Sequence, residues 1–298
     1  MKLTEKQQHE IELAQQEINN HQPHQAVKRL APIDEEVDDQ QLRYIYAQAL
    51  VADQQYTKAW RLIEDDRAAY FNDQEHQLFY LDVMLKNQLF ISARLFANQL
   101  GDNRLIAIVS KAEEHATQTE SATINARENN FYHLGDRPFR GQQERFEEAA
   151  KLPLANYLKA AKFVIRDPYV HPLLRSSVIQ DLANLKVNEE MTFYWIDEQE
   201  HTVNPGKLLP LDQIPVVIRM MRRLQDNYAQ NNPMSYQSFV QQFHLQLILL
   251  YPRIEETITD EDAWFQVLTA YSRTDNTSRI TLAYDWQAKL MRIIQRLM

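Results

Sequence analysis

The chain has 298 residues, of which 32 are basic and 41 acidic, so its formal net charge at pH 7 is −9. This acidic balance argues against nucleic acid as the main partner, because nucleic-acid-binding proteins usually carry a basic surplus that displaces counterions from phosphates. The sequence contains no cysteine, which excludes disulfides, thiolate catalysis and Cys-ligated metal sites. Only four residues are glycine, which disfavours glycine-rich phosphate loops and favours helices joined by short polar turns.

The sequence shows no sign of membrane insertion or secretion. Residues 1–10 are polar and lack the apolar core of a signal peptide. The most apolar run, residues 245–251, is far shorter than the roughly 20 residues of a membrane-spanning helix. We therefore expect a cytoplasmic protein without a membrane segment.

A repeated pattern marks the first hundred residues. Three alanines follow one another at spacings of 33 and 34 residues: Ala26, Ala59 and Ala93. Three residues before each alanine stands a proline or an aromatic residue, namely Pro23, Tyr56 and Phe90. Polar turns precede these positions at His21-Gln22, Asp53-Gln54-Gln55 and Lys86-Asn87-Gln88. Twelve residues before the alanines stand Ala14, Ala47 and Leu81.

This spacing predicts helical hairpins. A helix of about 14 residues, a short turn and a second helix close a hairpin in roughly 34 residues. Small residues let the two helices approach where they cross, and larger ones such as Leu30, Ile63 and Phe96 fill the space between neighbouring hairpins. One hairpin cannot bury its apolar side alone, so several must stack.

The pattern covers about residues 4–100 and resembles the tetratricopeptide repeat (TPR) family. It departs from that family because no tryptophan occupies the usual early position and the proline that often closes the second helix is missing from repeats two and three. The whole chain is similar to uncharacterised TPR proteins of low-GC Gram-positive bacteria. The resemblance implies an all-α solenoid of antiparallel helical hairpins. It further implies an adaptor or scaffold that binds a peptide or protein, without catalytic activity or a cofactor.

In arrays of this type the first helix of each hairpin lines a groove. The repeat register assigns the following residues to it: Gln15, Ile18, Tyr44, Gln48, Leu78, Asp82 and Lys86. Family members that clamp a terminal carboxylate carry Lys, Arg and Asn in several groove positions, and this chain matches at Asn19 and Lys86 at most. The mixed groove suits an extended or helical peptide better. Alternatively, apolar members such as Ile11 and Ile18 pack against adjacent helices.

Beyond residue 100 the repeat fades. Ala126 lies 33 residues after Ala93, which leaves a fourth hairpin open, and the Gly and Pro in residues 131–138 suggest a boundary between a repeat domain at 1–130 and a helical region at 131–298. The β-branched and aromatic run at 191–196 predicts a β-hairpin at about 190–204. We expect helices at 105–116, 121–130, 142–151, 154–165, 172–185, 211–228, 234–250, 263–271 and 279–298.

Two alternative functions remain from the sequence. Arg219, Arg222 and Arg223 share one predicted helix, and they can engage an acidic protein, an RNA backbone or acidic residues of the protein itself. An enzyme would need a composite site from distant residues near the β-hairpin, for instance His133, Asp136, His171 and His201. No metal-ligand spacing supports a metal site.

Overall fold

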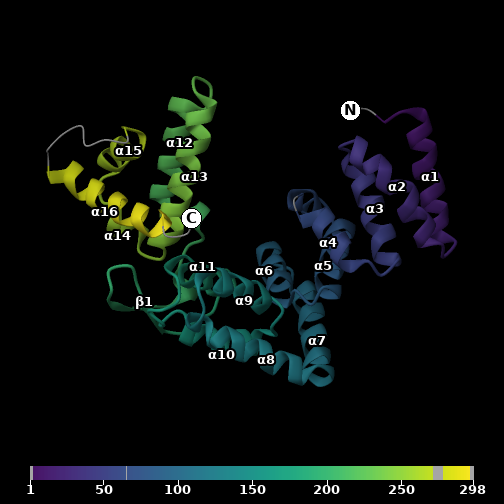
Figure 1. Ribbon diagram of the computed structural model, residues 1–298, viewed down its shortest axis with the longest axis horizontal. Helices are drawn as coiled ribbons and strands as arrows, with labels where there is room; N and C mark the ends of the chain where they lie inside the picture. Colours follow the sequence, from purple (N-terminus) through teal and green to yellow (C-terminus); the bar gives the residue numbers. More distant parts are fainter. Residues whose placement is uncertain (1–2, 65, 271–277, 296–298) are drawn as a thin grey trace. The chain divides into compact units, whose positions relative to one another are not determined.

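The computed structural model describes residues 3–64, 66–270 and 278–295, and its chain forms two compact units (Figure 1). Unit 1 consists of Met1–Ser121 with Ala150–Leu154, and unit 2 consists of Ala122–Ala149 with Ala155–Met298. The domain boundary expected at residue 130 therefore lies nine residues beyond the main break between the units.

Unit 1 is built from helices that follow one another in pairs. Aspartates at positions 39, 73 and 102 begin three of these helices, and each side chain accepts a hydrogen bond from a backbone N–H of the first turn. Thr4 and Gln7 form a reciprocal capping box at the start of the first. The elements are α1 (Glu5–Asn19), α2 (Pro23–Glu36), α3 (Gln40–Ala52), α4 (Tyr56–Glu64), the 3-10 helix η1 (Arg67–Phe71), α5 (Gln74–Lys86), α6 (Phe90–Leu100) and α7 (Asn103–Thr119).

The three hairpin turns share one backbone conformation. His21, Gln54 and Gln88 have φ values of 58°, 58° and 60°, in the left-handed region. In each turn the next N–H donates to the carbonyl five residues earlier, at 2.8 Å, 2.8 Å and 2.9 Å for the pairs Gln22–Glu17, Gln55–Leu50 and Leu89–Met84. This bond closes the preceding helix in the manner of a Schellman motif. The repeated turns recur at the predicted spacings of 33 and 34 residues.

The small residues of the repeat lie in the core of unit 1. Ala26, Ala59 and Ala93 are each 0% exposed, as are Ala14 and Ala47. The larger side chains around them are equally buried, namely Leu30, Ile63, Leu81 and Phe96. The prediction of an all-α array of TPR-like hairpins is confirmed.

The fourth hairpin that the sequence left open does not form with the turn of the first three. α7 ends at Thr119 and α8 (Ser121–Tyr132) begins two residues later, which leaves no room for the turn of the first three hairpins. Ala126 is exposed, unlike the three repeat alanines. α7 instead contributes the buried Glu113, whose carboxylate accepts hydrogen bonds from Arg94 at 2.6 Å and 2.7 Å and from the Leu154 N–H at 3.3 Å. The Leu154 bond, together with the Ile91 N–H that donates to the Ala150 carbonyl at 3.0 Å, holds the segment Ala150–Leu154 on unit 1.

Unit 2 is also helical, with the expected β-hairpin. Strands β1 (Met191–Tyr194) and β2 (Glu200–Val203) pair antiparallel, and Phe193 on β1 is 1% exposed. The last residue of the predicted helix 263–271 and the last three residues of the predicted helix 279–298 lie outside the described residues. The remaining elements are η2 (Leu134–Asp136), α9 (Phe139–Ala149), α10 (Leu154–Val164), α11 (Pro172–Asn184), η3 (Pro205–Lys207), η4 (Leu211–Gln213), α12 (Pro215–Tyr228), α13 (Pro233–Leu250), α14 (Ile254–Thr257), α15 (Glu261–Ala270) and α16 (Ser278–Gln295).

Two polar networks of buried and half-buried side chains fix helices within unit 2. The Trp264 indole N–H donates to Gln246 at 3.0 Å, Gln246 donates to Gln287 at 3.2 Å, and Gln287 donates to the Trp264 carbonyl at 2.8 Å. This closed ring of hydrogen bonds joins α13, α15 and α16. Between α10 and α11, the Tyr157 hydroxyl donates to Asp181 at 2.8 Å. Burial raises the pKa of Asp181 to about 6.

We expect Gln54→Gly to stabilise the protein by about 0.5–1 kcal/mol, because a left-handed residue with a Cβ costs roughly 1 kcal/mol that glycine avoids. Urea unfolding followed by circular dichroism measures the change. The control Lys58→Gly, at an exposed position within α4, should destabilise by about 1 kcal/mol. A loss of stability in Gln54→Gly would contradict the repeated turn geometry.

The raised pKa of Asp181 predicts a pH dependence of stability. The folded protein favours the protonated carboxyl, so this group's contribution is fully present below its unfolded pKa of about 4 and is lost as the pH rises to about 6. Asp181→Asn keeps an acceptor for the Tyr157 hydroxyl and cannot ionise. Relative to the wild type, the variant should gain on the order of 2–3 kcal/mol in unfolding free energy between pH 4 and pH 7. An equal difference in unfolding free energy between variant and wild type at both pH values would contradict the raised pKa of Asp181.

Candidate protein-interaction site

The first helices of the three hairpins, α1, α3 and α5, carry the seven residues that the sequence assigns to a groove. We call the surface formed by these seven residues the first-helix face. Four of them are exposed, namely Gln15, Leu78, Asp82 and Lys86, and three are half-buried, namely Ile18, Tyr44 and Gln48. Ile11, in contrast, is 9% exposed and belongs to the core of unit 1. All seven residues therefore keep part of their side chains at the surface.

Tyr44 joins α3 to α5. Its ring lies 4.2 Å from the His76 ring and 5.1 Å from the Phe79 ring, measured between centroids. Its hydroxyl donates to Glu75 at 3.2 Å. Burial, together with the charge of Glu75, raises the pKa of Tyr44 to about 12. The hydroxyl thus remains a hydrogen-bond donor at neutral pH, and the tyrosine fixes two first helices side by side.

The α5 part of the first-helix face carries an apolar residue beside a compensated charge pair. Leu78 is 39% exposed, so part of its apolar side chain is open to contact. About two turns later, the Lys86 Nζ lies 3.7 Å from Asp82 and 5.2 Å from the centre of the Tyr56 ring. Because Lys86 already has these partners, the face presents no cluster of free cations for a terminal carboxylate.

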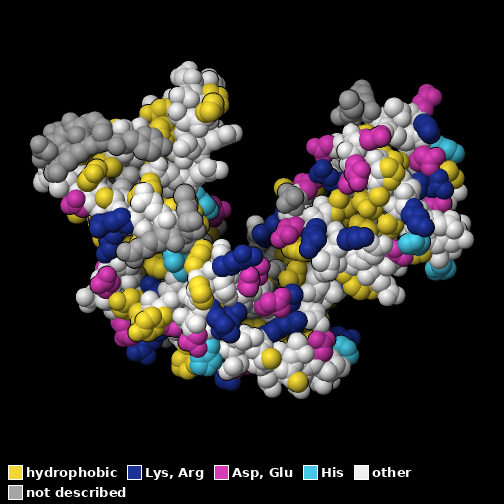
Figure 2. Space-filling model, viewed as in Figure 1, with side chains coloured by type: hydrophobic (Ala, Val, Ile, Leu, Met, Phe, Trp, Pro, Cys, Tyr) yellow, Lys and Arg dark blue, Asp and Glu magenta, His cyan; other side chains and the backbone are white. Residues whose placement is uncertain are grey.

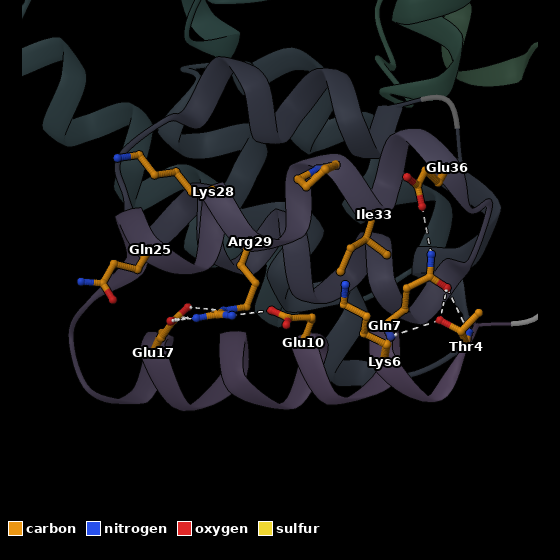
Figure 3. A pocket seen from close by; sticks show the side chains of 11 residues that line it. Thr4, Lys6, Gln7, Glu10, Glu17, Gln25, Lys28, Arg29, Ile33 and Glu36 are labelled. Carbon is orange, nitrogen blue, oxygen red and sulfur yellow. Dashed lines mark hydrogen bonds and ion pairs between the residues drawn. The ribbon is translucent and has the colours of Figure 1, made fainter.

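A large open pocket lies on the first hairpin, between α1 and α2. Its volume is about 820 Å³. Of its lining residues, only Glu17 is adjacent in sequence to a residue of the first-helix face, Ile18. Figure 3 shows Arg29 reaching from α2 to Glu10 and Glu17 on α1, with 2.6 Å to Glu17. Among the lining side chains, Lys6, Lys28 and Arg29 balance three glutamates.

We interpret this pocket as the polar end of the array. A terminal repeat needs a polar outer face to stay soluble, and balanced charges supply it here. The sequence did not predict the pocket. The only signal for it was the glutamate pair at positions 10 and 17, which recurs at two helical turns.

The predicted basic face of α12 is largely paired within unit 2. Arg219 donates to Glu261 at 2.6 Å and 2.9 Å. Arg223 bonds Asp262 at 2.5 Å, and its guanidinium lies 4.1 Å from the centre of the Phe265 ring. Arg222 is exposed and has no ion-pair partner among the residues that the structure describes. On the face shown in Figure 2, Lys and Arg side chains are interspersed with Asp and Glu.

The three histidines proposed for a composite enzyme site have separate neighbours. His133 lies 3.3 Å from Asp136, whereas His171 caps α11 and its ring lies 4.5 Å from the Phe139 ring, tilted by 56°. His201 lies 2.8 Å from Asp197. Within the described ranges, no hydrogen bond or ring contact joins the three histidines, and no group of His, Asp and Glu is arranged to hold a metal ion.

Comparison with known proteins supports the TPR-like resemblance. The TPR repeat-containing protein YsoA of Bacillus subtilis (strain 168) is 24% identical over 115 residues, which cover 39% of this chain and 34% of that protein. The chain thus matches about a third of the length of that curated relative. No protein-family model and no solved structure matches the chain. None of the described helices is both long enough and apolar enough to cross a membrane.

The paired arginines of α12 predict unequal contributions to stability. Arg223→Ala should destabilise unit 2 by about 1 kcal/mol, because it removes a cation–π contact and an ion pair. Arg222→Ala should change the free energy of unfolding by less than about 0.5 kcal/mol. Thermal unfolding of the two variants compares them directly. Equal losses would show that the α12–α15 pairing does not form in solution.

Proposed function

We propose that the protein is a cytoplasmic adaptor or scaffold, and that a peptide segment of a partner protein binds to the first-helix face of unit 1. The stacked hairpins and the relative with TPR repeats support a protein-interaction module. The proposal assigns no catalytic step to the protein. Nucleic acid receives little support, because two of the three arginines of the basic face pair with acidic residues of α15.

The observation that carries the proposal is the exposure of Leu78 on α5. Leu78 lies one turn from Glu75, which holds the Tyr44 hydroxyl, so an apolar contact and an aromatic edge are close together. Burying the exposed part of a leucine side chain against a partner contributes about 1 kcal/mol or more.

The polar residues of the face indicate how the rest of a peptide is held. Gln15 and Gln48 carry amides that both donate and accept hydrogen bonds, as the main chain of an extended peptide requires. The Asp82–Lys86 pair adds charge of both signs without a net surplus. Such a surface suits a peptide with an apolar anchor residue and polar flanks.

A peptide-display selection against the full chain tests the proposal. Selected peptides should bind the wild type in fluorescence anisotropy titrations and lose at least about tenfold in affinity with Leu78→Asp, because a carboxylate replaces the apolar anchor. The control Leu282→Asp introduces the same change on α16, where the leucine is 52% exposed, and should bind as the wild type does. Peptides that bind Leu78→Asp as tightly as the wild type would contradict the proposed site.

A further inference from the structure

A pocket of unit 2 is lined by aromatic rings that remain exposed. It lies at the C-terminal ends of α8 and α10, next to η2, and its volume is about 310 Å³. Its lining consists of two aromatic residues, two aspartates, one histidine and one arginine, namely Tyr132, Phe163, Asp136, Asp167, His133 and Arg166. All six belong to unit 2, and none is part of the first-helix face, so the pocket is independent of the proposed peptide site.

The two aromatic rings form an open corner. Tyr132 is 38% exposed and Phe163 is 49% exposed, so both side chains keep surface that a ligand can contact. Their ring centroids lie 4.4 Å apart, and the ring planes are tilted by 49°. Because of this tilt the rings form two sides of a corner and not a closed stack. Aromatic faces are electron-rich and attract cations.

The Asp167 carboxylate is held at the pocket by its neighbours. Its Oδ1 accepts a hydrogen bond from the Tyr169 N–H at 2.8 Å. Its Oδ2 lies so close to Gly135 that a Cβ at position 135 would force the carboxylate to move. Arg175 donates to the Asp167 carbonyl at 2.8 Å, which fixes the backbone and leaves the carboxylate to the pocket. The negative charge is therefore in place before a ligand binds.

The charges around the pocket favour a cationic ligand. The Arg166 guanidinium donates to Glu200 at 2.9 Å, and Glu200 compensates its charge without lining the pocket. The Asp136 carboxylate lies 3.3 Å from the His133 Nδ1. Asp167 forms no ion pair with any residue that the structure describes. The pocket therefore combines an unpaired carboxylate with two exposed rings, and both attract positive charge.

We propose that this pocket binds an alkylated ammonium group, whose charge lies against the Tyr132 and Phe163 rings and near the Asp167 carboxylate. A cation with N–H donors needs several acceptors to replace its hydration, and Asp167 already accepts from Tyr169. A quaternary ammonium group has no N–H donor and is recognised by aromatic faces. At about 30 Å³ for each water-sized group, 310 Å³ holds roughly ten heavy atoms, enough for a cation the size of choline.

Saturation-transfer NMR titration of the full chain with choline tests this site, because the N-methyl protons of choline report contact with the protein. The wild type should bind choline saturably at millimolar concentration. The uncharged isostere 3,3-dimethylbutan-1-ol should bind at least about fivefold more weakly, because it has the same shape but no charge. Phe163→Leu keeps an apolar side chain and removes one ring, so it should weaken choline binding about fivefold.

Two further variants separate the charge from the general apolar surface. Asp167→Asn keeps an acceptor for the Tyr169 N–H and removes the negative charge, so it should weaken choline binding about threefold and leave binding of the isostere unchanged. Tyr284→Leu is the matched control for Phe163→Leu, because Tyr284 on α16 is 37% exposed and does not line the pocket. It should bind choline as the wild type does.

Three results would overturn the proposal: no saturable binding of choline, equal binding of the uncharged isostere, or binding unchanged in both Phe163→Leu and Asp167→Asn. Tighter binding of methyl glucoside than of choline, lost in Phe163→Leu, would also overturn it, because the rings would then hold a sugar. Phosphatidylcholine vesicles distinguish the source of the cation. Sedimentation of the wild type but not of Phe163→Leu with the vesicles indicates a lipid headgroup, whereas choline binding without sedimentation indicates a free solute.

Discussion

The close approach of paired helices at three buried alanines is the constraint on which unit 1 depends. Ala26, Ala59 and Ala93 lie at the start of the second helices and have no exposed surface. A larger side chain at such a position forces the helices apart and typically costs 1–3 kcal/mol. Because the alanines recur at nearly constant spacing, each hairpin has the same geometry and can stack on the next.

The turns add a second constraint that acts together with the alanines. A left-handed residue at positions 21, 54 and 88 ends each first helix and directs the chain into the second. The first helices then present their outer residues on one surface, which Tyr44 makes continuous between α3 and α5.

The repeat and the β-hairpin could be predicted from the sequence because both depend on local spacing. The alanines, the polar turns and the run at 191–196 each encode a structure within a few residues of themselves. The spacing of Ala126 suggested a fourth hairpin, but this hairpin does not form. Only one residue separates Thr119 from Ser121, which leaves no room for a turn. A single matching residue does not define a repeat when its turn is missing.

The surface properties were less predictable, because they depend on partners distant in sequence. Helical periodicity placed Leu78, Asp82 and Lys86 correctly on the exposed side of α5. It could not show that Arg219 and Arg223 pair with acidic residues about 40 positions away.

Photo-cross-linking tests most directly whether the first-helix face carries the partner contact. A benzoylphenylalanine in place of Leu78, irradiated in cells that produce the protein, should join it to a discrete partner protein. The same residue in place of Leu282, which is exposed to a similar extent, should not give that product. Identical products from both positions, or none from position 78, would contradict the assignment of protein binding to this face.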